Sequence, residues 1–347
     1  MKKVLLIQDR IMHYRVPVFN ALAEKVDLTV LYSFEELPDG IKFKTLHVPH
    51  FKLRYKIHKK NLCRIANRYD VVIVMMDFSY LYVRLLSKKR RKYKLIYWGI
   101  GVSAGYNIRY DSDSLQVDTS YKRVKKADAV GFYCSYPIEK YVKMGIEKEK
   151  MFVFNNTVKV LPVDEREKDL ILFIGTLYKQ KKIDVLLENY FRAYNKNKNV
   201  PTLAIIGDGD ERASIGSWIS EKGLNGKILL AGAVYNEAEL ASYFSRSIMC
   251  ISPDQAGLSV LKSMGYGVPF ITHKDAITGG EIFNIENGVN GVLLNSFDDI
   301  EGLILESADN PEKFFDMGEK AKKHYEENRS VEKMVDGFME AIGFVSE

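Results

Sequence analysis

The sequence predicts an α/β protein made of two Rossmann-like domains that face each other across a cleft. Its 347 residues suit two domains of about 150 residues each. Short β-rich runs alternate with helical patterns in both halves, which is typical of parallel sheets. A polar, proline-containing segment, 155–169, separates two apolar runs and is the expected linker. We therefore expect domains at 1–160 and 161–330, followed by a C-terminal segment, 331–347.

In the first half, helices are expected at 17–25, where Pro17 suits a first turn, and at 135–145. Ligands of such sheets bind at the carboxyl ends of the strands. The expected strands are 4–7, 27–32, 70–76, 94–98, 128–133 and 150–154.

In the second half, helices are expected at 181–196, 210–223, 236–247 and 258–267. The expected strands between them are 170–175, 202–207, 227–232, 248–252, 268–272 and 291–294. The last stretch, 331–344, repeats apolar residues on one helical face, so we expect it to pack back on the first domain.

Composition indicates a soluble globular protein of a reducing compartment. Apolar residues make up 46% and charged residues 28% of the chain, and no apolar run approaches the roughly 20 residues of a membrane span. The apolar part of the N-terminus, VLLI, is shorter than the core of a secretion signal. Three widely spaced cysteines without a CxxC pattern indicate neither disulfides nor a zinc site. We expect a cytoplasmic protein.

Charge is distributed unevenly along the chain. Residues 1–160 carry 31 Lys and Arg against 15 Asp and Glu, a net charge of +16, and the remainder has a net charge of −10. Basic residues with interleaved aromatics cluster at 51–60 and 88–94. A solvated face would explain either run alone, whereas both together favour a polyanionic partner. Because no nucleic-acid-binding motif accompanies them, we predict peripheral attachment to the anionic inner face of a membrane rather than nucleic-acid binding.

Several second-half strands end in glycine, which indicates a ligand site at one edge of that sheet. Gly175-Thr176, Gly207 and Gly232 each follow a predicted strand, and glycine permits tight turns and close backbone approach. A nearby lysine can neutralise a phosphate, although each lysine at 179–182 is by itself typical of a surface loop.

The loop SPDQAGLS, which precedes the predicted helix at 258–267, has the features of an anion site. Gly257 stands directly before the helix, and the unpaired N–H groups of a helix N-terminus bind phosphates. Ser259 has an alternative role as an N-cap.

These segments resemble the donor domain of glycosyltransferase family 4, whose members are retaining, sugar-nucleotide-dependent enzymes with the GT-B fold. The matching segments are IGTLYKQKKIDVLLENYFRA, LAIIGDGDER, KILLAGAV, SPDQAGLSVLKSMGYGVPFIT and GGEIFNIENGVNGVLL, in the family's order. The first half matches more weakly, through HYRVPVFNALA and ADAVGFYCSYPIEKYVKMGI.

The resemblance implies roles for particular residues in donor binding. Asp254 would lie near the transferred sugar and Lys181 at the diphosphate, both with catalytic roles. Lys262 stands where the family usually has a second acid that holds the ribose, and a cation cannot accept those hydrogen bonds. Lys262 would instead reach a phosphate or remain an exposed helix lysine. The remaining donor-binding positions implied are Gly175, Thr176 (often Arg in the family), Gly207, Val234, Gly257, Leu258, Ser259 and Glu281.

Strand ends of the first half supply candidates for the acceptor side. His13-Tyr14-Arg15 follows the first strand, and Asp77 follows the third. Asp77 would bind or deprotonate an acceptor hydroxyl, or cap the next helix, and His13 would aid proton transfer or act only as a surface residue. Gly99 and Gly101 follow the YW strand, where related enzymes often have a His and this chain has Ile100.

The leading hypothesis is a glycosyltransferase that moves a sugar from a nucleotide-sugar to a saccharide hydroxyl with retention, on a lipid-linked acceptor. The resemblance implies neither a catalytic base nor a cofactor, and the sequence has no His/Cys cluster that predicts a metal site. The alternatives are a sugar-nucleotide-binding partner subunit that has lost activity, and a sugar-nucleotide epimerase, which the six histidines disfavour. A dinucleotide dehydrogenase is disfavoured because neither half begins with GxGxxG after its first strand.

Overall fold

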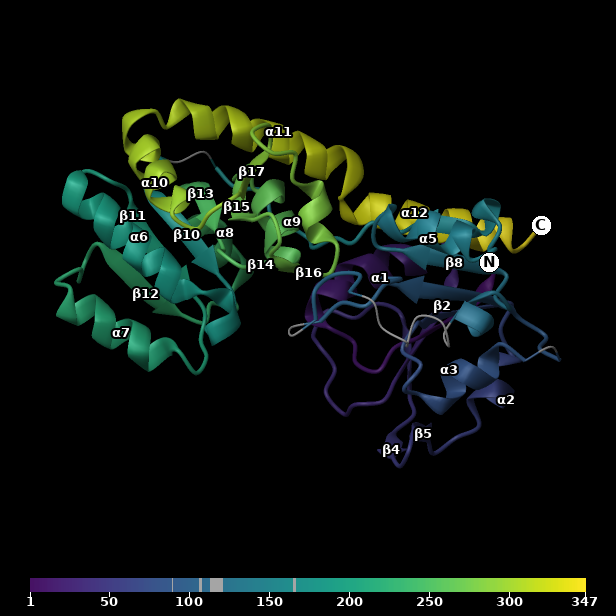
Figure 1. Cartoon of the computed structure of the whole chain (residues 1–347). Helices are drawn as coiled ribbons and strands as arrows, with labels where there is room; N and C mark the ends of the chain where they lie inside the picture. Colours follow the sequence, from purple (N-terminus) through teal and green to yellow (C-terminus); the bar gives the residue numbers. More distant parts are fainter. Residues whose placement is uncertain (89, 106–107, 113–120, 165–166) are drawn as a thin grey trace. The chain divides into compact units, whose positions relative to one another are not determined.

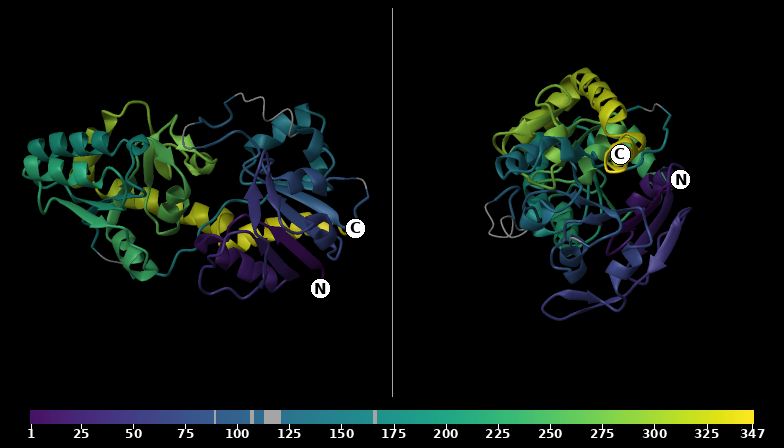
Figure 2. Two further views of the ribbon diagram at one scale, coloured as in Figure 1. Left: turned by 90° about the horizontal axis from the view of Figure 1, so that it is seen from below. Right: turned by 90° about the vertical axis from the view of Figure 1, so that its right-hand side faces the viewer.

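The computed structural model describes residues 1–88, 90–105, 108–112, 121–164 and 167–347. The chain divides into two compact units, each treated separately below (Figure 1). The first unit comprises Met1–Ser103, Asp111–Lys159 and Ser330–Glu347, and the second comprises Ala104–Tyr110 and Val160–Arg329. Both chain ends lie in the first unit (Figure 2).

The first unit is built on a seven-stranded parallel sheet of order β3-β2-β1-β6-β7-β8-β9. Its central strands are continuous apolar runs buried on both faces, as parallel sheets require. The strands are β1 (Lys3–Ile7), β2 (Asp27–Tyr32), β3 (Lys44–His47), β6 (Val71–Met75), β7 (Lys94–Gly99), β8 (Ala129–Phe132) and β9 (Met151–Val153). The helices are α1 (Val16–Ala23), α2 (Leu62–Ala66), α3 (Leu81–Leu86), α5 (Tyr136–Lys143) and α12 (Val331–Phe344), with 3-10 turns η1 (His13–Arg15) and η2 (Lys148–Lys150).

Helix α12 belongs to the core of the first unit, although it is the last element of the chain. The ring of Phe338 lies 4.4 Å from that of Phe154 and 5.1 Å from that of Trp98. A side chain at Gly337 would come 2.7 Å from the carbonyl oxygen of Val153, so this glycine lets the helix approach the backbone closely. The buried face of α12 is the one that the apolar repeat predicts.

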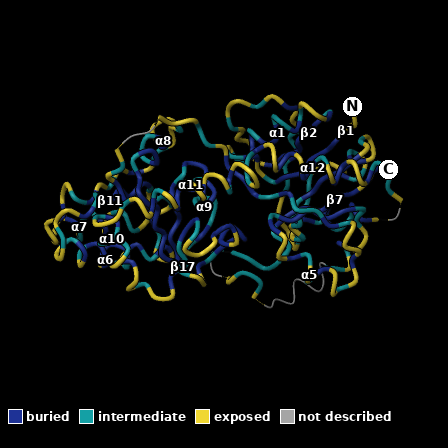
Figure 3. The backbone as a smooth tube through the Cα atoms, turned by 90° about the horizontal axis from the view of Figure 1, so that it is seen from above, coloured by how far each residue is buried: buried dark blue, intermediate teal, exposed yellow. Residues whose placement is uncertain are grey.

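The second unit has a six-stranded parallel sheet of order β12-β11-β10-β13-β15-β17 and a two-stranded sheet of β14 and β16. Figure 3 shows much of this sheet as buried, whereas the edge strand β12 has exposed residues. The strands are β10 (Leu170–Ile174), β11 (Thr202–Ile206), β12 (Ile228–Gly232), β13 (Ser247–Ile251), β14 (Gln255–Ala256), β15 (Phe270–His273), β16 (Ile277–Thr278) and β17 (Gly291–Leu294). The helices are α6 (Ile183–Lys196), α7 (Arg212–Glu221), α8 (Glu237–Ser245), α9 (Leu258–Gly265), α10 (Asp299–Asp309) and α11 (Glu312–Asn328), with 3-10 turns η3 (Lys179–Lys181) and η4 (Glu281–Asn284).

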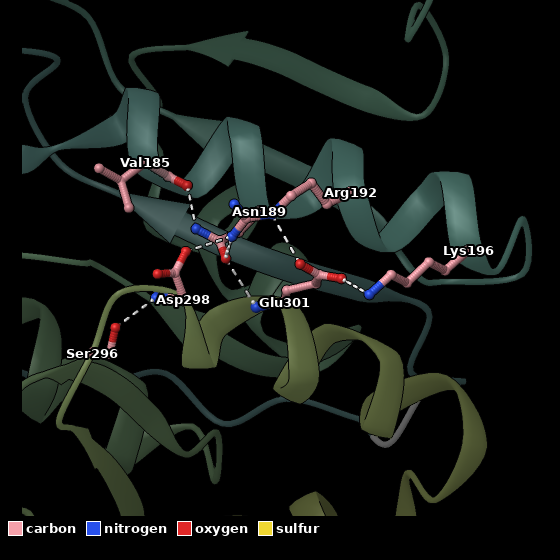
Figure 4. A network of polar contacts seen from close by, with 7 residues as sticks. All are labelled: Val185, Asn189, Arg192, Lys196, Ser296, Asp298 and Glu301. Carbon is pink, nitrogen blue, oxygen red and sulfur yellow. Dashed lines mark hydrogen bonds and ion pairs between the residues drawn. The ribbon is translucent and has the colours of Figure 1, made fainter.

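An ion-pair network joins α6 to α10 on the surface of the second unit (Figure 4). The carboxylate of Glu301 pairs with Arg192 Nε at 2.8 Å and with Lys196 Nζ at 2.5 Å, and Lys196 first, then Arg192, lowers the pKa of that carboxyl. Arg192 also pairs with Asp298 at 2.8 Å. Arg192, Lys196 and Asp298 are exposed, whereas only 15% of the Glu301 side chain is, so we regard the network as a contact that sets the register of the two helices.

Each parallel sheet reverses its strand order at one point. In the first unit, β2 and β3 lie on one side of β1, and β6, β7, β8 and β9 follow on the other side. In the second unit the reversal falls between β10 and β13. Loops diverge at such a reversal and leave a crevice outside the carboxyl ends of the strands, where ligands of this fold class bind. Two crevices are therefore expected, one in each unit.

The structure also departs from several sequence-based expectations. The chain does pass from the first to the second unit between Lys159 and Val160, within the expected linker 155–169, but Asn156, Thr157 and Val158 of that segment are buried. The sequence pattern did not predict β3, the hairpin of β4 (His50–Lys52) and β5 (Lys56–His58), α2, α3, β14, β16, α10 or α11. Among the described residues, none of the helices has the length and apolar character that crossing a membrane requires.

Candidate functional site

The loops at the carboxyl ends of β10 and β11 in the second unit pack tightly on one another. A Cβ atom at Gly207 would overlap the carbonyl oxygen of Gly175, and one at Gly209 would overlap that of Leu177. The loops after β10 and β11 thus need glycine in order to meet. The sequence predicted that these glycines let the backbone approach a ligand closely. At Gly207 the structure shows instead that the backbone closely approaches the neighbouring loop at Gly175. Thr176, between these loops, is exposed.

Lys181 is the cation that these loops enclose. It ends η3 and is only 7% exposed, and a Cβ atom at Gly175 would lie 2.9 Å from its Nζ atom. Burial lowers the pKa of Lys181 to about 8. Within the described ranges no carboxylate forms an ion pair with it, which leaves a buried ammonium group to be matched by an incoming anion. Its neighbours differ, because Lys179 is exposed and Lys182 pairs with Asp254 at 2.9 Å.

The loop after β13 leads from Asp254 into α9. Gly257 is the N-cap of α9 and no side chain caps the helix. A Cβ atom at Gly257 would have no atom within 4 Å, so the space beside this N-terminus is open. Ser259 lies inside the helix and is not its N-cap. The first N–H groups of α9, including those of Leu258 and Ser259, therefore offer donors to an anion.

Lys262 is neither an exposed helix lysine nor an isolated charge. Its Nζ atom lies 2.9 and 2.7 Å from the two carboxylate oxygens of Glu237, and only 15% of its side chain is exposed. Glu237 begins α8, which Asn236 caps. Half-buried Val234 and the 90% exposed Tyr235 precede it. The carboxylate of Glu237, at the start of α8, is thus held beside Lys262 of α9.

Glu281 is buried at the start of η4 and accepts a hydrogen bond from Gly279 N at 3.0 Å. Glu281 is therefore a buried, hydrogen-bonded carboxylate and not a solvated one. Its role beside a sugar stays a prediction.

In the first unit the predicted acceptor-side residues have differing surroundings. His13 is exposed and Tyr14 half-buried. Arg15 is 4% exposed, and its guanidinium lies 5.2 to 5.4 Å from the ring centroids of Tyr14, Trp98 and Tyr133. It also donates to Tyr133 Oη at 3.1 Å, so core packing accounts for its position.

The glycines after β7 are partly explained by the packing of their own unit. A Cβ atom at Gly101 would lie 2.5 Å from Phe132 Cδ1, whereas one at Gly99 would make ordinary contact with Met76. Asp77 accepts from Ser79 N at 2.9 Å within a turn, and the following helix α3 has Tyr80 as its N-cap. Asp77 therefore does not cap that helix.

The two basic segments also differ from each other. Segment 51–60 forms the β4–β5 hairpin, whose tip exposes Phe51, Leu53 and Arg54. In 88–94, Arg91 pairs with Asp128 at 2.7 Å and Tyr93 is buried, so this aromatic is not on a surface patch. Position 89 lies outside the described residues.

Three side chains of the first unit that the sequence pattern did not indicate, those of His50, Lys56 and His58, lie beside the predicted Asp77. Asp9 and Asp77 follow β1 and β6, and the β4–β5 hairpin adds His50, Lys56 and His58 to them. The hairpin strands are three residues long and lack a clear alternation, so periodicity gave no signal for them.

Comparison with known proteins agrees with this architecture. Residues 157–324 match the family described as Glycosyl transferases group 1. The chain is 27% identical over 258 residues to an uncharacterized 41.2 kDa protein in the cps region of Klebsiella pneumoniae, covering 69% of this chain and 68% of that protein. It is 24% identical over 210 residues to the uncharacterized glycosyltransferase MJ1178 of Methanocaldococcus jannaschii, covering 58% and 56%.

Solved structures resemble the chain over nearly its whole length. Anabaena Alr3699/HepE, crystallised with UDP and glucose, has a TM-score of 0.74 at 12% identity and covers 99% of this chain and 100% of its own. The lipopolysaccharide outer core galactosyltransferase WaaB has a TM-score of 0.70 at 16% identity, with coverage of 98% and 99%. The chain therefore has the GT-B fold, and its match to Glycosyl transferases group 1 over residues 157–324 supports a glycosyltransferase.

Proposed function

We propose that this protein transfers a sugar from a nucleotide-sugar to a saccharide hydroxyl, with retention of anomeric configuration. The observation that carries the proposal is the pairing of a buried, unmatched Lys181 with the uncapped N-terminus of α9, both in loops at the β10/β13 crevice. A diphosphate supplies the charge and the acceptor oxygens that these groups lack. HepE, whose structure contains UDP and glucose, makes a UDP-sugar the first donor to test.

In the proposed reaction, the bond between the anomeric carbon and the diphosphate oxygen breaks, and the electron pair leaves with the diphosphate. Lys181 and the N–H groups of Leu258 and Ser259 stabilise the charge that develops there. The acceptor hydroxyl attacks from the same face of the sugar, and its proton passes to the departing phosphate oxygen. The protein therefore supplies neither a dedicated base nor a resident metal. Asp254, oriented by Lys182, accepts hydrogen bonds from hydroxyls of the transferred sugar.

We assign the ribose-holding carboxylate to Glu237. Lys262 occupies the position where related enzymes usually have an acid, and it holds both oxygens of Glu237. A carboxylate can accept hydrogen bonds from two ribose hydroxyls, which an ammonium group cannot. The assignment predicts that Glu237→Gln reduces the preference for UDP over 2′-deoxy-UDP. An unchanged preference contradicts it.

We further propose that the acceptor is lipid-linked and that the first unit attaches to an anionic membrane surface. The β4–β5 hairpin carries Phe51 and Leu53 beside Lys52 and Arg54 at its exposed tip. Apolar and basic side chains together suit a bilayer interface, and each basic residue near it contributes about 1 kcal/mol. Cosedimentation with phosphatidylserine vesicles at low and high salt tests this. We expect Lys52→Gln/Arg54→Gln to reduce binding, and equal binding by the wild type and this variant would refute it.

A thermal-shift screen of nucleoside diphosphates and sugar nucleotides tests the donor side of the proposal, because a ligand of the folded state raises its stability. The stabilising donor then enters assays of hydrolysis and transfer with Lys181→Ala and Asp254→Ala. Lys179→Ala, which changes an exposed lysine of the same turn, is the matched control. Donor turnover that is unaffected by the first two changes would overturn the site assignment. A nucleotide shift without turnover would favour the inactive binding subunit.

A further inference from the structure

Gln255 belongs to the loop between β13 and α9, directly after Asp254 and two residues before the N-cap Gly257. Its backbone is held in β14, where Gln255 pairs with Ile277 of β16. The side chain is half-buried, so a ligand of the second unit can reach it. The proposed reaction uses Asp254 and the N-terminus of α9 but gives no role to the amide between them.

Tyr178 fixes the orientation of the Gln255 amide. The hydroxyl of Tyr178 donates to Gln255 Oε1 at 2.5 Å. A side-chain amide has one oxygen that accepts and one nitrogen that carries two N–H donors. Because Tyr178 occupies the oxygen, the nitrogen lies on the other side of the planar amide. Among the described residues, no group accepts a hydrogen bond from Gln255 Nε2, so its N–H groups are available to a ligand.

Tyr178 also connects this amide to Lys181. It is the N-cap of η3, and the centre of its ring lies 6.0 Å from Lys181 Nζ. At the other end of η3, Lys182 pairs with Asp254 at 2.9 Å. The two ends of one short turn thus contact two consecutive residues of the loop after β13. These contacts place the Gln255 amide beside the groups that the proposed function assigns to the donor.

We propose that Gln255 is a further donor-binding residue, whose amide N–H groups donate to an oxygen of the diphosphate, and that Tyr178 is the positioning residue that orients this amide. The phosphate is favoured over a sugar hydroxyl because the amide lies between Lys181, which Tyr178 contacts, and the uncapped helix that begins after Gly257. A hydrogen bond to a charged acceptor is also stronger than one to a neutral hydroxyl. This inference rests on the proposed function, because it adds a residue to the donor site.

Substitutions at the two positions separate binding from positioning. Gln255→Met keeps the length of the side chain but removes its N–H groups, so the affinity for UDP will fall by roughly tenfold or more. Gln255→Glu still accepts from Tyr178 but replaces the N–H groups by negative charge, so it will weaken UDP binding further.

Tyr178→Phe keeps the ring beside Lys181 and removes only the hydroxyl. It will weaken UDP binding by roughly two- to fivefold, because the amide is no longer held in one orientation. In the Gln255→Met background the same change will have no effect on UDP binding, since a positioning residue acts only through the residue that it orients.

Tyr190→Phe is the matched control in the same unit. The hydroxyl of Tyr190 lies 2.9 Å from Pro201 O and 3.0 Å from Lys227 O, so it stabilises the fold through backbone contacts. We expect Tyr190→Phe to lower the melting temperature and to leave UDP affinity unchanged.

Calorimetric titration of UDP and UDP-glucose into the wild type, the four single variants and the double variant Tyr178→Phe/Gln255→Met tests the inference. UDP affinity that is unchanged in Gln255→Met overturns the phosphate contact, and a loss confined to UDP-glucose would place the amide at the sugar instead. Equal weakening by Tyr178→Phe in both backgrounds overturns its positioning role. Each of these outcomes leaves the donor proposal standing, whereas absence of UDP binding by the wild type counts against the proposed function itself.

Discussion

Lys181 allows the donor proposal to be tested through stability as well as activity. A buried ammonium group without a carboxylate partner reduces the stability of the free protein, and its retention is then explained by the ligand it binds. We predict that Lys181→Met stabilises the free protein and abolishes nucleotide binding. Met keeps much of the apolar stem while removing the charge.

The size of the effect follows from the pKa of Lys181. Burial lowers this pKa from 10.5 to about 8, so the charged form is disfavoured in the folded state. At 1.36 kcal/mol per pKa unit, this corresponds to roughly 3 kcal/mol at pH 7. The side chain is 7% exposed, so solvent screening removes little of this. Between pH 8 and 10.5 the unfolded chain binds more protons than the folded one, so wild-type stability rises with pH and approaches that of Lys181→Met.

The assay is denaturant unfolding of the wild type, Lys181→Met and the control Lys179→Met at pH 7 and pH 10, followed by thermal shift with UDP. We expect Lys181→Met to unfold at higher denaturant than the wild type at pH 7, with a smaller difference at pH 10. Lys179→Met should match the wild type, because Lys179 is exposed.

UDP binding has a pH signature of its own. Diphosphate binding to Lys181 restores its proton above pH 8, so affinity should fall as pH rises through that value, with proton uptake in calorimetry. A Lys181→Met protein that is no more stable than wild type, or that still binds UDP with wild-type affinity, would refute the reasoning.

Three further predictions concern other parts of the two units. Gly257→Val should leave the melting temperature nearly unchanged, because its Cβ position is open, but should remove the thermal shift by UDP; a retained shift would mean that nothing approaches the α9 N-terminus there. Burial lowers the pKa of His58 to about 4, so the unfolded chain binds more protons between pH 4 and 6.5, and stability should be lost as pH falls through that range. His58→Gln should flatten this pH dependence in acid denaturation, and identical curves would contradict the assignment to His58. Finally, EDTA should leave the initial rate of sugar transfer unchanged in a radiolabelled-donor assay, and a rate restored only by added Mg²⁺ or Mn²⁺ would show that a metal takes part.

Prediction from the sequence succeeded where a single element carried its own signal. The strand 27–32 and the helix 331–344 occur at the predicted residues, because a buried parallel strand needs a mostly apolar run and a docked helix needs a regular apolar face. Short elements whose side chains meet partners far along the chain gave no such signal, as β4, β5 and β14 show. The helix α11 was also missed, although it is 17 residues long.

The chemistry of single residues was harder to foresee than the fold. The lysines at 179, 181 and 182 cannot be distinguished by residue type. In the structure Lys179 is exposed, Lys181 is buried and Lys182 is paired with Asp254. The difference arises from which side of a 3-10 turn faces the loops, a property of the turn and not of its composition.

The sequence by itself determined that this chain forms two parallel α/β sheets with glycine-rich strand ends, because backbone geometry restricts which residues can form buried strands and tight turns. Only the tertiary structure decided that Lys262 pairs with Glu237 of another helix, and that a hairpin places histidines and a lysine beside Asp9 and Asp77. Such pairings depend on distances between segments tens of residues apart in the chain. These distances are fixed by packing of the whole unit, so no local pattern records them.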